Sequence, residues 1–399
     1  MANAAVTPKE PTQTAWLEVF LLWFAGISAA MQFAKFSVSY NELLTYYQAG
    51  PTWTGAAISV VGIIGLIFGV TAGLMAGKIG YRKVLLGALL LGATLSFIQS
   101  TLPSFEIVMA TRVLEGFSQL GVVVAAPTMI ARLSAPQHRS ITMGIWGTFF
   151  GVAFALAGLF GQPLIAAFDL NGLYFAHGVF ISVMIIALLL LLEKDESRFS
   201  DAPVPNQDSY WQKMVNIYRT PQTLLPGLIF VFYTSTLVSL LTYIPNFISS
   251  DALRPIMQVL LPLLSTAGTF LAGTLSQYVL RPQRVAQLAY AGLALGGLVL
   301  AQDFASPLLF SIIVGEMVLC AGLIPGAALA MVPRLARNSA EQANGYGLIA
   351  QLGNLGATVG PPSYAAMITL FGLYGLVGLV LFVCGMGSVF ALLAARLEK

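Results

Sequence analysis

Two ionisable side chains stand three residues apart inside an apolar stretch of the sequence. Arg112 and Glu115 lie near the start of residues 111–133, which are otherwise apolar enough for a lipid bilayer, and Gln119 follows one turn later. A charge at membrane depth costs at least about 2.5–3.5 kcal/mol, so such residues need a protein or water partner. Steps of three and four residues place these side chains on one helical face. Paired charges of this kind can carry a proton or bind a charged solute, which predicts that the face lines a cavity.

The first apolar run carries a stripe of polar residues at steps of three or four, namely Ser28, Gln32, Lys35, Ser39 and Glu42. A continuous polar stripe through an apolar helix favours the wall of a cavity. The alternative is that Lys35 extends toward the headgroups and that Glu42 lies in the interface.

The second half of the chain has fewer polar residues at membrane depth. They are Tyr243, Asn246, Glu316, Gln351 and Asn354. Glu316 lies about 13 Å from the surface if Pro307 marks that surface and each residue rises 1.5 Å. We expect these side chains to face the same cavity from the opposite side.

The composition requires a membrane around these residues. The chain has 399 residues, of which 57% are hydrophobic and 9% charged, and its mean hydropathy is +0.83. A spanning helix needs about 20 apolar residues. Twelve such runs are present, at residues 17–46, 54–76, 84–100, 105–131, 141–168, 174–192, 224–247, 255–280, 285–301, 308–332, 344–370 and 372–395. The sequence predicts an all-α polytopic membrane protein whose first run is a span and not a removable signal peptide.

The positions of lysine and arginine predict the orientation. With a cytoplasmic N-terminus, the cytoplasmic segments hold Lys9, Lys78, Arg82, Lys83, Arg132, Arg139, Lys194, Arg198, Lys213, Arg219, Arg281, Arg284, Arg334, Arg337, Arg396 and Lys399. The opposite loops hold Arg254 alone, and Lys35 and Arg112 lie within spans. Both termini are therefore expected in the cytoplasm, with the protein in the cell (inner) membrane. The net charge of +3 calls for no nucleic-acid partner.

The loop after the second run resembles the G-x-L-A-D-R-x-G-R-K motif of the major facilitator superfamily. Matching residues are Gly73, Leu74, Ala76, Gly80, Arg82 and Lys83, whereas Gly77 takes the place of the aspartate. The resemblance implies that Gly73, Gly80, Arg82 and Lys83 belong to a conformational switching loop. The alternative is that the cations only anchor this loop at the cytoplasmic face.

Two further motifs are similar to the same superfamily. Arg112 and Gly116 match the R-x-x-x-G pattern of the fourth helix, which is often found in proton-coupled members. Gly147 and Gly151 match part of the fifth-helix motif of drug antiporters, but Val152 replaces its proline, which counts against a typical drug antiporter. The resemblance implies two pseudo-symmetric six-helix bundles around a cavity lined by helices 1, 4, 7 and 10.

The domain organisation follows the same division. We expect a first bundle at residues 1–192, a cytoplasmic linker with a short amphipathic helix at 193–222, and a second bundle at 223–399. The halves echo each other weakly at an offset of about 200 residues, with Glu115 opposite Glu316.

The sequence offers no chemistry for an enzyme. It contains no phosphate-binding G-x-x-x-x-G-K-[ST] loop and no cysteine–histidine cluster with metal-ligand spacing, so we expect no cofactor and no metal. Cys320 and Cys384 are expected to be buried thiols. His177, near the outer end of the sixth run, is expected to be a satisfied interfacial imidazole.

The prediction is a monomeric secondary transporter that moves a small organic, anionic solute with protons by alternating access. Substrate-binding candidates are Gln32, Lys35, Arg112, Gln119, Tyr243, Asn246, Gln351 and Asn354, and proton-coupling candidates are Glu115 and Glu316. A static alternative is that Arg112–Glu115 and Lys35–Glu316 are ion pairs that only hold a closed state. The alternative functions are proton-driven export of drugs, metabolites or amphiphiles and, less favoured, a membrane sensor.

Overall fold

The computed structural model describes residues 12–192, 215, 218–302, 306–337 and 339–397. Every regular element among them is helical. The first half contains α1 (Trp16–Val38), α2 (Tyr40–Tyr47), α3 (Pro51–Ser59), α4 (Gly62–Ile79), α5 (Tyr81–Ser100), α6 (Phe105–Leu133), α7 (Arg139–Gly147) and α8 (Phe149–Leu191). The second contains α10 (Pro221–Tyr243), the 3-10 turn η3 (Ile244–Phe247), α11 (Leu253–Tyr278), α12 (Pro282–Leu300), α13 (Pro307–Leu335) and α14 (Ser339–Leu397).

Two helices are each long enough to cross a bilayer twice. At a rise of 1.5 Å per residue, the 43 residues of α8 would extend roughly 65 Å, against about 30 Å of hydrocarbon. Non-helical backbone at Asp169 (φ 55°) breaks α8, and Gly372 (φ 58°) breaks the 59 residues of α14. Each therefore provides two spans connected by a sharp turn.

The second span consists of two helices. The axes of α3 and α4 meet at 49°, and Val60 and Val61 lie at the break between them. By length and composition, the described residues contain eight helices that can cross a membrane, or nine with the bent pair. Dividing α8 and α14 at their breaks and adding the shorter α12 gives twelve spans. The predicted all-α fold with twelve spans is confirmed. The sequence did not predict the interruptions at Ser39 and at Val60–Val61, which fall inside its first two apolar runs.

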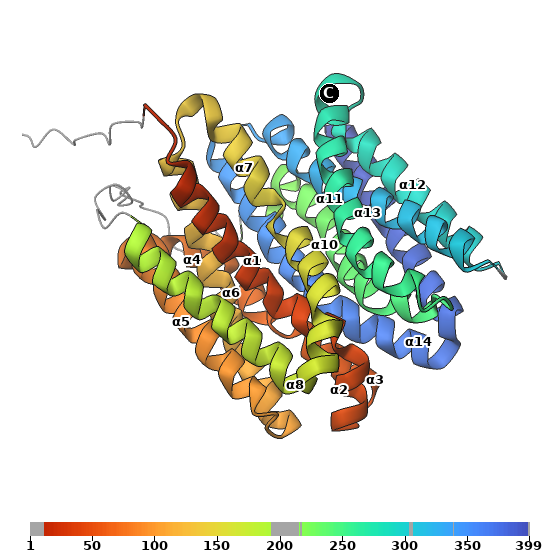
Figure 1. Ribbon diagram of the computed structural model, residues 1–399. Helices are drawn as coiled ribbons and strands as arrows, with labels where there is room; N and C mark the ends of the chain where they lie inside the picture. The colour runs from red at the N-terminus through yellow and green to blue at the C-terminus, as the bar shows by residue number, and fades with distance from the viewer. Residues whose placement is uncertain (1–11, 193–214, 216–217, 303–305, 338, 398–399) are drawn as a thin grey trace, which may run out of the picture.

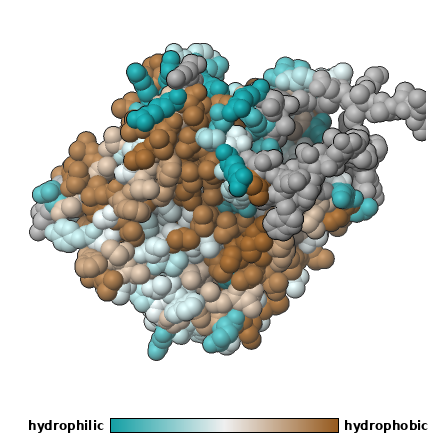
Figure 2. All heavy atoms as spheres, turned by 180° about the vertical axis from the view of Figure 1, so that it is seen from behind, coloured by the Kyte–Doolittle hydropathy of each residue, from teal (hydrophilic) through white to brown (hydrophobic). Residues whose placement is uncertain are grey.

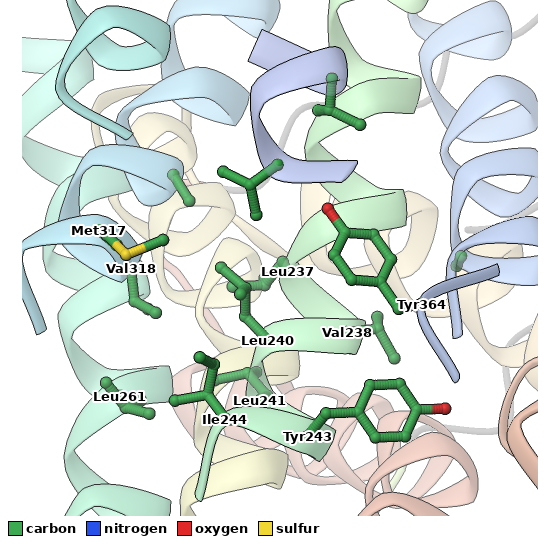
Figure 3. Packing of buried hydrophobic residues seen from close by; sticks show 14 of the residues in the cluster. Leu237, Val238, Leu240, Leu241, Tyr243, Ile244, Leu261, Met317, Val318 and Tyr364 are labelled. Carbon is green, nitrogen blue, oxygen red and sulfur yellow. The ribbon is translucent and has the colours of Figure 1, made fainter. Parts of the chain in front are cut away.

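The helices form two bundles that stand side by side, coloured red to yellow-green and green to blue in Figure 1. In the first bundle α1 packs on α6 and α8, and α5 packs on both as well. In the second, α10 lies at the centre against α13 and α14. Figure 3 shows Leu237 and Leu241 of α10, and Ile244 of η3, directed toward the side chains of α11 and α13.

The two bundles meet along two contacts. In the first, α14 packs against α3 and α4, and in the second, α11 packs against α8. Glycine permits the close approach: a Cβ atom on Gly158 of α8 would lie 2.6 Å from the backbone oxygen of Gln258 in α11. Large apolar side chains cover much of the outer surface, with polar residues at its upper and lower edges (Figure 2). This is the surface expected of a protein embedded in lipid.

The predicted boundaries of the two domains stay a prediction. Most of the linker at residues 193–222 lies outside the described residues, although Val215 and Tyr218 of its predicted amphipathic helix are described and helical. The end of the molecule at which α2 and η3 lie, at the bottom of Figure 1, is called the gate end below, and the opposite end is called the linker end.

Candidate functional site

Lys35 of α1 occupies the centre of a polar cluster inside the first bundle. Its Nζ atom lies 2.7 Å from Glu115 Oε1, 2.7 Å from Gln99 Oε1, 2.9 Å from Ser96 Oγ and 3.1 Å from His177 Nδ1. These partners come from α5, α6 and α8, so four helices contribute to the cluster. An ammonium has three protons and no acceptor, so these four oxygen and nitrogen atoms share three donors.

Arg112 approaches the same carboxylate from α6. One guanidinium nitrogen pairs with Glu115 Oε2, and the planar group lies 4.2 Å from the ring centre of Phe36. The other nitrogens reach a different helix: Nε donates to the backbone oxygen of Ala57, and Nη2 to that of Ile58, both at 2.7 Å. Glu115 is thus shared between two cations, and Arg112 also binds the last turn of α3.

His177 is a neutral partner in this network. Because Nδ1 faces the Lys35 ammonium, which can only donate, we assign Nδ1 as the acceptor. The proton then lies on Nε2, which donates to the backbone oxygen of Ser28 at 2.9 Å. The expected interfacial position was wrong, because the His177 side chain is buried beside Lys35.

The cluster is closed to solvent. Arg112 and Glu115 are 0% exposed and Lys35 is 2% exposed. Two cations and one carboxylate leave one positive charge uncompensated within the cluster. An uncompensated charge in a water-excluded site is costly and is retained in proteins mainly for function. Lys35, Arg112 and Glu115 therefore lie together inside one bundle, whereas the sequence predicted that they line a cavity facing the other bundle.

Sequence reasoning missed three members of the cluster: Ser96, Gln99 and His177. A weak signal was present, because Ser96 and Gln99 are polar and three residues apart in an apolar helix. Two predicted residues lie close by. Gln32 Nε2 donates to Ser118 Oγ at 2.8 Å inside the bundle. Gln119 Oε1 is buried and has no hydrogen-bond partner among the described residues.

The candidates from the second half lie at contacts and do not surround one solute. Tyr243 donates its hydroxyl to the backbone oxygen of Pro361 at 2.9 Å, and its ring packs on Tyr40. Asn246 hydrogen-bonds Asn41 at the gate end. Gln351 donates to the backbone oxygen of Leu66 in α4 at 2.6 Å.

Asn354 belongs to the same contact between α4 and α14. Its amide donates to the backbone oxygen of Ala350 at 2.9 Å, within its own helix. A Cβ on Gly65 would meet the Asn354 amide nitrogen at 2.4 Å, so the asparagine lies directly against α4.

Glu316 stands apart from all of these residues. It is exposed at the junction of α13 and α12, where Cys320 Sγ donates to its Oε1 at 3.0 Å. Its other oxygen lies 2.6 Å from the position a Cβ would take on Gly296. The Lys35–Glu316 ion pair of the static alternative was wrong, because Lys35 pairs with Glu115. The expectation failed because Glu316 and Lys35 sit in different bundles.

The predicted switching loop lies at the linker end. Gly80, with φ 103°, ends α4 and starts α5, a backbone conformation that residues with a Cβ rarely adopt. Arg82 and Lys83 occupy the first turn of α5, and Gly73 lies within α4. Its switching role stays a prediction.

A cavity of about 330 Å³ lies between the bundles at the gate end. Glu42 and Gln162 line it from the first bundle, and Asn246, Arg254 and Gln258 from the second. Gln162 donates to Glu42 Oε1 at 3.1 Å. The volume of this cavity is at the lower end of the range for small-molecule sites, and its polar lining suits a small polar molecule.

Known proteins share this architecture. The sequence matches the Major Facilitator Superfamily over residues 22–361. It is 28% identical over 120 residues to the inner membrane transport protein YajR of Escherichia coli (strain K12), a match that covers 30% of this chain and 26% of YajR.

Two crystal structures of a bacterial homologue of the human lysosomal transporter Spinster are similar in fold. The inward-facing occupied form has a TM-score of 0.74 at 14% identity, covering 95% of this chain and 96% of that one. The inward-facing unoccupied form has a TM-score of 0.73 at 14% identity, covering 96% and 97%. With twelve spans in two bundles and a family match over most of its length, this chain belongs to the Major Facilitator Superfamily and is a secondary transporter.

Proposed function

We propose that this transporter moves a small organic, anionic solute together with protons, in the direction of uptake, by alternating access. The observation that carries the proposal is the buried cluster of Lys35, Arg112 and Glu115, with one positive charge in excess. A fixed positive charge in a low-dielectric bundle favours anions in the adjacent space between the bundles. The solute site lies between the two bundles, as alternating access requires.

The same charge count suggests the proton step. Loss of one proton would leave the cluster neutral, whereas gain of one would leave it with two positive charges. Since buried net charge is costly, we propose that Lys35 releases and regains the transported proton. Glu115 then acts in coupling by holding the Lys35 ammonium at 2.7 Å.

The gate end is closed by contacts between the bundles. Ser37 Oγ lies 2.7 Å from Thr242 Oγ1, and Asn41 and Asn246 exchange two hydrogen bonds. We propose that this end faces the outside, because cations such as Arg82, Lys83 and Arg284 lie at the opposite end. Both termini would then be cytoplasmic. The inward-facing form of the two similar structures supports this orientation, and the name of YajR supports a location in the inner membrane.

The test is uptake into liposomes that contain the purified protein. A panel of labelled organic acids is offered with and without an inward proton gradient, and the best acid is then used for counterflow, which needs no gradient. We expect Lys35→Met and Glu115→Gln to lose gradient-driven accumulation while keeping counterflow. Glu316→Gln serves as the matched control and should accumulate solute normally. Full accumulation by both cluster variants would refute proton coupling through this cluster.

A second candidate function is export of drugs, metabolites or amphiphiles. The observation in its favour is an aromatic wall on α8, where the rings of Phe150 and Phe154 lie 5.0 Å apart. Phe150 and Tyr233 line a small cavity of about 40 Å³ between the bundles. Proton-driven efflux of ethidium or tetraphenylphosphonium from inverted vesicles, unaffected by Lys35→Met, would favour this function over the first.

A further inference from the structure

The bend in the second span lies where Arg112 touches it. The last carbonyls of a helix have no amide partner within that helix, and the C-terminal end carries partial negative charge. At the end of α3, the Arg112 guanidinium supplies donors to two of these carbonyls, on Ala57 and Ile58. An arginine can serve two acceptors at once because its planar group presents several fixed N–H bonds.

Gly116, one turn further along α6, packs against the residues of the same bend. A Cβ on Gly116 would lie 2.5 Å from the backbone oxygen of Val61 and 2.7 Å from Cγ1 of Ile64. Arg112 and Gly116 are four residues apart and share one face of α6. The arginine therefore holds the end of α3, while the glycine leaves room for the break that follows it.

The segments on both sides of the break contact the second bundle, with Ser59 at the end of α3 and Leu66 in α4. Ser59 Oγ donates to the backbone oxygen of Thr358 at 2.8 Å, and Gln351 donates to that of Leu66 at 2.6 Å. A Cβ on Gly62 would lie 2.5 Å from Thr358 Oγ1. Because α4 and α14 are packed directly against each other, a change in the bend must move these contacts.

The second bundle provides an internal comparison. At the offset that places Glu115 opposite Glu316, the position of Arg112 is occupied by Ile313. The corresponding second span of that bundle, α11, is one uninterrupted helix of 26 residues despite Pro262. The bend occurs in the bundle that has the arginine.

We infer that Arg112 is a positioning residue: it holds the bend between α3 and α4, and it transmits changes at the Lys35–Glu115 pair to the contact between the bundles. The connection runs from Lys35 through Glu115 to Arg112, and from Arg112 to the carbonyls of Ala57 and Ile58. The transmission of changes from the Lys35–Glu115 pair rests on the proposed proton step, whereas the role of Arg112 in holding the bend does not.

The position of α4 against α14 can be measured with an engineered disulfide. A Cβ on Gly69 would lie 3.6 Å from Cβ of Gln351, within the range for a disulfide. The test protein carries Gly69→Cys and Gln351→Cys, with Cys320→Ser and Cys384→Ser to remove the native thiols. Two readouts are taken, the rate of disulfide formation with copper phenanthroline and hydrogen exchange of peptides that cover residues 57–66.

Three variants are compared in this background. Arg112→Lys keeps the charge but replaces the planar fork of five fixed N–H donors with a single ammonium nitrogen. Gly116→Ala leaves every charge in place and forces the break away from α6. The control Arg334→Met removes another arginine that donates to a backbone carbonyl, that of Ser276, away from any bend.

Both α6 variants should change the disulfide rate and speed exchange at residues 57–66, on the order of tenfold, because buried hydrogen bonds to the break are lost. The control should leave both readouts at the parent values. If Arg112→Lys and Gly116→Ala both match the parent, or if the control shows the same change, the inference is wrong. No solute or proton gradient is present, so this outcome is separate from failure of the proposed transport function.

Discussion

The side-chain amides of Asn41 and Asn246 hydrogen-bond each other in both directions, at 2.8 Å and 3.2 Å, across the boundary between the two bundles. The residues are 205 positions apart, and so are Ser37 and Thr242, which meet 2.7 Å apart nearby. Equal offsets at two successive contacts are expected where a pseudo-two-fold axis along the membrane normal passes between the bundles. These pairs close the gate end, and alternating access requires them to separate.

Locking this gate should stop transport reversibly. In a Cys320→Ser/Cys384→Ser background, we expect Ser37→Cys/Thr242→Cys to form a disulfide, because the γ atoms of the native side chains are 2.7 Å apart. Counterflow of solute should disappear on oxidation and return after reduction. Each single cysteine variant is the control and should be insensitive to oxidant. Undiminished counterflow in the fully cross-linked protein would mean that this end does not open.

Loss of the shared carboxylate should destabilise the first bundle strongly. Glu115→Gln leaves the Lys35 and Arg112 cations buried together without a counter-charge, at a cost of about 3–5 kcal/mol. The double variant Lys35→Met/Glu115→Gln should be more stable than Glu115→Gln alone, because it removes one of the two like charges. Thermal unfolding in detergent gives the comparison. A double variant less stable than either single variant would contradict the charge count.

The two glutamates within spans should behave differently. Glu316 is exposed and its recorded partner is the Cys320 thiol, so Glu316→Gln should shift the unfolding temperature little. Gradient-driven accumulation should also continue, because Glu316 packs against α12 within the second bundle. Both variants are measured in parallel. If Glu316→Gln loses accumulation and Glu115→Gln does not, proton coupling belongs to the second bundle instead.

Close helix contacts in the second bundle should depend on particular glycines of α14. Gly360→Ala would place a methyl group 2.1 Å from the backbone oxygen of Ser235 in α10, and backbone cannot turn aside as a side chain can. We expect a loss of about 1–3 kcal/mol in unfolding free energy. Gly378→Ala, in the same helix with open space around it, should be neutral or slightly stabilising. Equal effects at both positions would show that helix propensity, and not packing, decides stability here.

The hydropathy of the chain was sufficient to predict the all-α fold and its twelve spans, because every helix in lipid must bury its backbone hydrogen bonds and expose apolar side chains. Local spacing also placed Arg112 and Glu115 together, since residues three apart share a helical face. The break at Asp169 fell between two predicted runs, and the break at Gly372 fell at the first residue of the last predicted run, so both were visible in the sequence.

Other features depend on which helices become neighbours, and no local pattern contains that information. Membership of Ser96, Gln99 and His177 in the cluster required α5 and α8 to pack around α1. The bend at Val60–Val61 contains no proline, so no local pattern indicates it, and it lies beside a guanidinium from α6.

The sequence by itself determined that this is a membrane protein with twelve helical spans and that some of its charges lie at membrane depth. Only the tertiary structure decided where those charges meet: Lys35 pairs with Glu115 inside one bundle, and Glu316 accepts a hydrogen bond from Cys320 in the other. The physical reason is one of range. Hydrophobicity and helical spacing act over a few residues, whereas an ion pair between residues 80 positions apart is set by the packing of whole helices.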